Sequence, residues 1–153
     1  MADLVGAGAA LGWLEPPSPG EIATLLAEIN RAVAANDSAV RYAYERGELV
    51  GFGYWRRYER PTHRPHADLE KLAVARSAQG RGVGGALLAQ LIEAARVAGI
   101  EVLTLDVRGD NASAQYLYQR FGFREYGRLP RFVAVGKDRY EKVFYALDLR
   151  APG

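Results

Sequence analysis

The sequence predicts one domain of the α/β (α+β) class, in which helices cover a mixed β-sheet. Its 153 residues suit a single domain with a continuous core. Hydrophobic residues make up 49% and charged residues 25%, which is the balance of a globular protein rather than of a disordered one. Strand patterns stand on both sides of a central strand, loop, helix, strand and helix, and this order predicts a mixed sandwich.

The N-terminal part of the chain predicts a helix followed by a hairpin. The helix is predicted over Glu21–Ala35, where apolar residues recur at helical spacing, namely Ile22, Leu25, Leu26, Ile29 and Val33. Valine and aromatic residues predict strands over Ala39–Tyr44 and Leu49–Tyr58, joined by a turn at residues 45–48. The prolines and charged residues of Arg60–His66 predict a loop.

A central strand is predicted over Asp68–Val74. Strict alternation places one set of side chains on one face of this strand, namely Leu69, Lys71 and Ala73. It places the other set on the opposite face, namely Asp68, Glu70, Leu72 and Val74. Two carboxylates are therefore expected to project from the same face.

Helices and strands alternate in the second half of the chain. The glycine-rich turn Gly80–Gly85 leads into a helix that ends at Gly99 and has an apolar stripe of Leu88, Leu91, Ile92 and Ala95. Residues Ile100–Val107 predict a strand. Asn111 is a good N-cap for a short helix over Ala112–Phe121. Two strands around a turn at residues 136–138 complete the pattern, namely Phe132–Val135 and Lys142–Leu149.

The loop at residues 79–84, Gln-Gly-Arg-Gly-Val-Gly, predicts an anion site. It stands between a strand and a helix, so several backbone N–H groups and the positive end of the helix dipole converge there. Glycine permits a positive φ and lets phosphate oxygens approach without a Cβ atom in the way. In a purely structural role, the same glycines would close a tight turn.

Two known phosphate-binding motifs compete to explain this loop. A P-loop would end in Gly-Lys-Ser or Gly-Lys-Thr, whereas Gly84 is followed by Gly85 and Ala86, so that interpretation fails. A dinucleotide-binding fold would place an acid about 20 residues further on, near where Asp106 stands. Hairpin-like strands precede the loop and little chain follows it, which leaves the dinucleotide fold as a weaker alternative.

From Asp68 to Leu149 the sequence resembles the GNAT superfamily of N-acetyltransferases. Gln79, Gly82 and Gly84 match the family's pyrophosphate loop, Gln/Arg-x-x-Gly-x-Gly/Ala. Upstream stands the segment Leu72-Ala73-Val74, as in the family. Downstream, at the family's spacing, stands Asn111-x-x-Ala114-x-x-Leu117-Tyr118-x-x-x-Gly122-Phe123. The first 67 residues share only the family's order of a helix followed by a hairpin.

The resemblance implies a GNAT-like three-layer sandwich over residues 1–153, with a mixed, mostly antiparallel sheet of six to seven strands, about four helices, and central strands that splay apart. It implies acetyl-coenzyme A as cosubstrate, whose pantetheine arm would lie along the backbone of Leu72, Ala73 and Val74 like an added strand. The phosphates would lie over the loop, namely Gln79, Gly80, Arg81, Gly82, Val83, Gly84 and Gly85. Asn111 is either a helix cap or a coenzyme contact.

The resemblance also assigns roles in catalysis. Acetyl transfer needs a neutral amine, a stabilised oxyanion and a proton for the leaving thiolate. Tyr118 matches the family's tyrosine that contacts and protonates the coenzyme A sulfur, with a packing role as the alternative. The candidate bases are Asp106 and Glu70, with Asp68 behind them, or a base acting through water. A backbone N–H of the central strand would hold the oxyanion. The chain has no cysteine, so direct attack within a ternary complex is expected.

Several other site classes are disfavoured. The absence of cysteine removes thiolate ligands and suits a reducing compartment, so we expect a cytoplasmic protein without a metal. His63 and His66 stand in a proline-bearing loop, which predicts a wall of the acceptor cleft rather than a metal site. A net charge of +2 without a basic stripe predicts no nucleic-acid partner. The uncharged stretch Leu4–Leu14 is too short to span a membrane, so no membrane partner is expected.

Three functions follow as hypotheses. The first is acetylation of the primary amine of a small molecule, because Glu70–Leu72 and Gly127–Pro130 resemble detoxifying family members such as tabtoxin-resistance acetyltransferase. The second is acetylation of a protein N-terminus or lysine, because Leu105–Arg108 resembles ribosomal-protein alanine acetyltransferases. The third is an acyl-coenzyme A sensor without catalysis. Relatives commonly dimerise, so the resemblance also suggests a homodimer.

Overall fold

A computed structural model describes residues 19–150, so the stretch Leu4–Leu14 lies outside the described residues. Six strands form one mixed sheet in the order β1-β2-β3-β4-β6-β5. The strands are β1 (Ser38–Glu45), β2 (Glu48–Arg57), β3 (Ala67–Val74), β4 (Val102–Arg108), β5 (Arg124–Val135) and β6 (Asp138–Asp148). The described helices are α2 (Pro19–Ala34), α3 (Val83–Val97) and α4 (Ala112–Arg120), with 3-10 turns η2 (Pro61–His63) and η3 (Arg76–Ala78). The predicted α/β class is confirmed.

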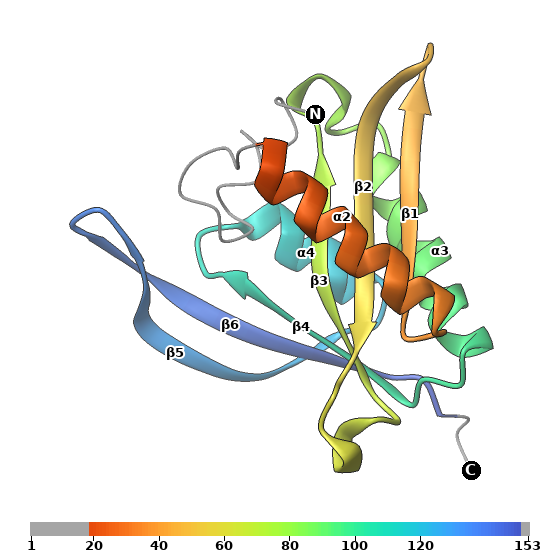
Figure 1. Cartoon of the computed structure of the whole chain (residues 1–153). Helices are drawn as coiled ribbons and strands as arrows, with labels where there is room; N and C mark the ends of the chain where they lie inside the picture. Colours follow the sequence, from red (N-terminus) through yellow and green to blue (C-terminus); the bar gives the residue numbers. More distant parts are fainter. Residues whose placement is uncertain (1–18, 151–153) are drawn as a thin grey trace.

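The helices form a layer on each face of the sheet. α2 crosses one face, whereas α3 and α4 lie behind the other (Figure 1). The larger core fills the space on the α3 and α4 side and includes Trp55, Leu88, Leu91, Leu103, Val143 and Tyr145. The smaller core includes Ile29, Phe52, Tyr54 and Ala73. Val33, one of the apolar residues at helical spacing in the first helix, is 41% exposed. None of the described helices has both the length and the apolar character needed to cross a lipid bilayer.

The sheet splits between its two central strands, as predicted. β3 and β4 run parallel and pair only at Ala67 with Leu103 and at Asp68 with Thr104. β3 stays paired with β2 as far as Val74, and β4 stays paired with β6 over its whole length. The two strands therefore diverge beyond this short junction (Figure 1), and a gap opens between their carboxyl-terminal parts.

A β-bulge at Glu70 corrects the predicted faces of β3. Tyr54 pairs with Lys71 and Trp55 pairs with Leu69, so Glu70 is the extra residue in this ladder. A bulge reverses the alternation of side chains beyond it. Leu69 consequently packs on the α3 face, whereas Ala73 belongs to the core under α2. The prediction that Leu69, Lys71 and Ala73 share a face was therefore wrong, because strict alternation holds only in a strand without a bulge.

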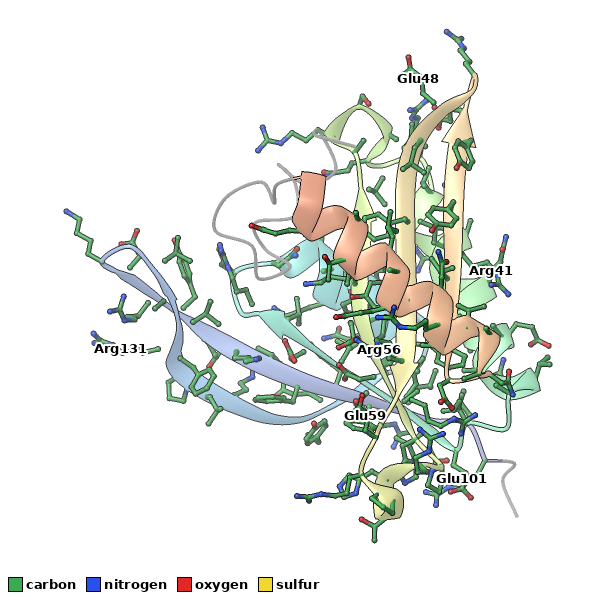
Figure 2. All side chains as sticks on the ribbon, viewed as in Figure 1. Arg41, Glu48, Arg56, Glu59, Glu101 and Arg131 are labelled. Carbon is green, nitrogen blue, oxygen red and sulfur yellow. The ribbon has the colours of Figure 1, made fainter. Side chains whose placement is uncertain are left out.

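The C-terminal hairpin is longer than predicted. β5 begins at Arg124 rather than Phe132, and β6 also begins earlier than expected. Gly127 and Pro130 obscure the strand in the sequence, because both residue types are depleted in strands. The register with β6 shifts at two places, and Arg131 lies in the second with a φ of 55°. The hairpin projects away from the helical layers, with Arg131 on its outer part (Figures 1 and 2).

Candidate active site

The loop before α3 leaves backbone N–H groups available to a ligand. Gly80 and Gly82 have φ values of 79° and 83°, a region that glycine adopts without strain. Gly82 is the N-cap of α3, and the first helical bond runs from the Ala86 N–H to its carbonyl at 3.0 Å. The N–H groups of residues 83–85 therefore have no acceptor within the helix. A Cβ atom on Gly80 or Gly82 would meet nothing within 4 Å, so the loop borders open space.

That space is a cavity of about 750 Å³. This volume falls in the range of about 300–1,000 Å³ that is typical of small-molecule and cofactor sites. The walls come from the end of β3, the glycine-rich loop, the first turn of α3, and α4. Most residues that the sequence assigned to the coenzyme line it, namely Leu72, Ala73, Val74, Gln79, Gly80, Gly82, Val83, Gly84, Gly85, Asn111 and Tyr118.

Two polar side chains of the loop are engaged within the protein. Arg81 does not line the cavity; its guanidinium lies 2.8 Å from a carboxylate oxygen of Glu45 and donates to the Ser77 carbonyl at 2.9 Å. Gln79 donates to the Val74 carbonyl at 3.1 Å, which ties the loop to the end of β3. Any anion in the cavity would therefore meet the backbone of this loop and not the Arg81 side chain.

α4 and its C-cap residue supply cavity residues that sequence reasoning missed, namely Ser113, Ala114, Tyr116, Leu117, Arg120 and Phe121. The carbonyl oxygen of the Asn111 side chain accepts a bond of 3.2 Å from the Ala114 N–H, which confirms the predicted N-cap. The Arg120 guanidinium lies 5.8 Å from the Tyr116 ring centroid. The i, i+4 spacing of these two residues was the available signal that they share one side of the helix.

Tyr118 is buried, but its hydroxyl is not engaged by the rest of the described chain. Its ring centroid lies 5.7 Å from that of Phe123 and 6.4 Å from that of Tyr145. The neighbouring Tyr145 hydroxyl is held by Gln115 and Gln119, whereas the Tyr118 hydroxyl makes no hydrogen bond within residues 19–150. Burial, with a smaller contribution from the charge of Asp106, raises the pKa of Tyr118. The phenol therefore stays protonated at neutral pH and borders the cavity.

Asp68 lies on the face opposite the cavity, at the junction of the diverging strands. Its carboxylate accepts a bond of 2.6 Å from the Thr104 hydroxyl, and that hydroxyl is also hydrogen-bonded to the Tyr58 hydroxyl. Because Thr104 has one proton to donate, Tyr58 donates to it, and the three groups form a chain. Burial raises the pKa of Asp68 to about 6, against the hydrogen bond from Thr104, which lowers it. This carboxyl group titrates close to neutrality.

The other two candidate bases differ in their surroundings. Asp106 is exposed on β4, on the same face as Asp68, and one of its oxygens lies 3.5 Å from the Lys142 ammonium. Glu70 lies 3.7 Å from Arg56, which also approaches Glu28 of α2; Figure 2 labels Arg56 on the side of the sheet that α2 covers. Burial raises the pKa of Glu70, and Arg56 opposes that shift. The structure thus brings Asp68 and Asp106 together and directs Glu70 toward Arg56.

The arrangement places a proton donor and a proton acceptor on opposite faces of one gap. The cavity and Tyr118 lie on the side of α3 and α4, and the carboxylates lie on the other side. Beyond Asp68 no residue of β4 pairs with β3, so the inner edge of β3 offers backbone groups to a ligand that enters the gap. Within residues 19–150, no group of three or more His, Asp or Glu side chains is placed to hold a metal ion.

Comparisons with known proteins agree with this geometry. A family model described as the acetyltransferase (GNAT) family matches residues 9–123. The chain is similar to the N-alpha-acetyltransferase RimI of Mycobacterium tuberculosis, with 35% identity over 115 residues that cover 74% of the chain and 70% of that protein. It is also similar to the mycothiol acetyltransferase of Propionibacterium freudenreichii, with 38% identity over 79 residues. That match covers 52% of the chain, and the chain spans only 25% of that protein.

The solved structures agree as well. The ribosomal-protein-alanine N-acetyltransferase from Brucella melitensis superposes with a TM-score of 0.83 at 25% sequence identity. The superposition covers 96% of this chain and 91% of that one. Because the superposition covers almost the whole of both chains, the similarity in fold includes the N-terminal half, where the sequence motifs gave little information.

Proposed function

The chain belongs to the GNAT family of acetyltransferases, and from this premise we propose that it transfers an acetyl group from acetyl-coenzyme A directly to a primary amine. Acetyl-coenzyme A is the cosubstrate of this family. The observation that carries the proposal is one cavity that joins three features, namely the open N–H groups of the glycine-rich loop, the free inner edge of β3, and the unengaged Tyr118 hydroxyl.

Each part of the coenzyme has a matching surface in this cavity. The N–H groups at the start of α3 and the helix dipole suit a pyrophosphate. Arg120 adds a cation at the cavity wall. The backbone of Leu72, Ala73 and Val74 suits the amides of an extended pantetheine arm, which would pair with it as a further strand would. The thioester would then lie in the gap, close to Tyr118.

The proton transfers are assigned to groups on the two sides of the gap. Tyr118 donates its proton to the departing thiolate, since its raised pKa keeps the phenol protonated until a base forms beside it and its hydroxyl has no competing partner in the described chain. The Asp68 and Asp106 carboxylates accept the proton of the amine, because they share the opposite face. Glu70, one of the two leading candidates from the sequence, is placed behind them because Arg56 lies beside its carboxylate.

The acceptor is proposed to be the primary amine of a small molecule. The side chains on the acceptor face agree with a cationic amine, because two carboxylates stand there beside aromatic rings. The comparisons favour a second candidate, the α-amine of a protein N-terminus, because the relatives that are named N-alpha-acetyltransferases include one of which the chain covers 70%. Both acceptors present a primary ammonium, so an assay must separate them.

The test measures release of free thiol from acetyl-coenzyme A. The acceptors are small primary amines, peptides with free N-termini, and the same peptides with blocked N-termini. Calorimetry with coenzyme A runs alongside. We expect coenzyme A to bind and one class of amine to release thiol well above the rate without acceptor. Binding without thiol release by any amine would leave an acyl-coenzyme A sensor, and the absence of binding would refute the proposal altogether.

A further inference from the structure

One lysine of this chain lies beside a candidate base. The sequence contains only three lysines, namely Lys71, Lys137 and Lys142. Lys142 lies on β6, where it pairs in register with Arg108 of β4, while Phe144 pairs with Asp106. Side chains two residues apart on a strand share a face. Lys142 therefore projects from the face of the sheet that carries the candidate bases.

The ammonium group of Lys142 is held by a carboxylate and two rings. Its nitrogen lies 3.5 Å from an Asp106 oxygen. It also lies 5.5 Å from the Phe132 ring centroid and 5.7 Å from the Phe144 ring centroid, within the distance at which cations and aromatic faces attract. The side chain is 27% exposed. These contacts describe a partly desolvated subsite for a primary ammonium, and the chain itself fills it.

Asp106 connects this subsite with the proposed acid across the gap. Asp106 stands two residues beyond Thr104, where β4 has already lost its pairing with β3. On the other face, burial first and the charge of Asp106 second raise the pKa of Tyr118. Asp106 thus interacts with the Lys142 ammonium on one side and, more weakly, with the Tyr118 phenol on the other.

We propose that Lys142 is an acceptor in its own right, and that the chain acetylates its own Lys142 when no other amine is present. This inference rests on the proposed acetyl transfer. The ammonium gives one proton to Asp106, and the free nitrogen attacks the thioester carbonyl. The C–N bond of the acetamide forms and the C–S bond breaks. The thiolate takes its proton from Tyr118, and the second proton of the attacking nitrogen leaves to solvent, which reprotonates the phenol.

The other two lysines lie elsewhere. Lys71 lies on β3, and its charge interacts more strongly with Glu70 than with Asp106. Lys137 lies in the turn at the tip of the β5–β6 hairpin, far from the gap between β3 and β4 (Figure 1). Lys71 and Lys137 therefore serve as internal controls for Lys142.

In the experiment, protein whose intact mass shows no acetylation at the start is incubated with acetyl-coenzyme A alone. Mass spectrometry then follows the intact mass and identifies the modified peptide. We expect one acetyl group, on Lys142, at a rate per molecule that does not change on tenfold dilution. Tyr118→Phe should slow the reaction at least about tenfold. Lys142→Arg should abolish it, and Lys137→Arg should leave it unchanged. The inference would be overturned by equal acetylation of Lys137, by acetylation of Lys71 in place of Lys142, or by a rate that is unchanged in Tyr118→Phe. Each result would show that the acetyl group reaches lysine by another route.

Two measurements on the same protein separate this inference from the proposed function. Calorimetry reports coenzyme A binding, and free thiol reports transfer to added amines. A chain that binds coenzyme A and acetylates an added amine but leaves Lys142 unmodified refutes the self-acetylation alone. A chain that neither binds coenzyme A nor releases thiol refutes the acetyltransferase and the self-acetylation together.

Discussion

Thr104 donates a hydrogen bond of 2.6 Å to Asp68 at the last residue pair that joins β3 to β4. The bond fixes a half-buried carboxylate at the point where the sheet opens. Burial raises the pKa of this group to about 6 while the bond lowers it, so Asp68 changes charge just below neutral pH. The ability of Asp68 to accept a proton in the gap between β3 and β4 therefore depends on the pH in this range.

Asp68 is expected to set the acidic limb of the rate profile. A carboxylate accepts a proton only when it is ionised, so kcat/KM should fall as the pH drops through about 6. Asp68→Asn should lower the rate at neutral pH and remove this limb. The measurement is kcat/KM against pH for both proteins with one responsive amine. A limb that persists unchanged in Asp68→Asn would assign the titration to another group.

The same residue should also affect stability, with a defined sign. The unfolded chain releases the Asp68 proton near pH 3.8, and the folded chain holds it until about 6. The folded state thus binds more protons between these values, and the contribution of Asp68 to stability declines as the pH rises through this window. Asp68→Asn keeps the acceptor for Thr104 without the charge. Its melting temperature should exceed that of the parent by about 3 °C near pH 8, and the difference should shrink or reverse near pH 4.5.

Replacing Tyr118 by Phe should affect chemistry and leave binding intact. The variant loses the proton donor but keeps the ring contacts with Phe123 and Tyr145. General acid catalysis typically contributes about a hundredfold or more, so kcat should fall on the order of a hundredfold. Calorimetry should give a similar coenzyme A affinity, and the melting temperature should barely change, because the hydroxyl has no hydrogen bond to lose within the described chain. An unchanged kcat would remove Tyr118 from the mechanism.

Gly82→Ala should weaken the anion site through the backbone. Gly82 has a φ of 83°, so alanine costs about 1 kcal/mol of strain or moves the loop. Gly47→Ala is the matched control, because Gly47 has a φ of 80° and equally open space, but lies in the β1–β2 turn and does not line the cavity. Both variants should lose similar stability. Only Gly82→Ala should raise the dissociation constant of coenzyme A, by roughly tenfold; equal affinities would argue against phosphates over this loop.

Arg120 should take the phosphate-binding role that the sequence analysis gave to Arg81. Arg120 lines the cavity, whereas Arg81 is paired with Glu45 outside it. Arg120→Ala should weaken coenzyme A binding by roughly threefold to tenfold, as expected for loss of an exposed charged contact to phosphate. Arg81→Ala should have little effect. Comparing coenzyme A with its dephosphorylated analogue would show which phosphate Arg120 meets, and a larger loss in Arg81→Ala would contradict the assignment.

Local chemistry explains what the sequence could predict. The glycine turn, the Asn111 cap and the position of Tyr118 on a short helix depend on residues close together in the chain, and the structure places all three at the cavity. The family resemblance added the splay between the central strands, which no local pattern contains. Together they predicted the fold class and most of the cavity lining.

Non-local pairing explains what the sequence could not predict. The Glu70 bulge exists only because β2 pairs with β3 in a shifted register, and the sequence of Asp68–Val74 alone does not predict it. The bond between Asp68 and Thr104 depends on a parallel pairing across a whole helix of intervening chain. Arg120 was missed for the same reason, since its place at the cavity follows from where α4 packs and not from its neighbours in sequence.

The two-pair junction between β3 and β4 has a consequence for how such a molecule evolves. A long ladder would fix the angle between the halves of the sheet, whereas here a buried core under α3 joins them, with Leu91 of α3, Trp55 of β2 and Leu103 of β4 in one cluster. Substitutions buried under that helix would widen or narrow the aperture without altering any group that meets a substrate. Selection can therefore retune the separation of donor and acceptor from within the hydrophobic interior.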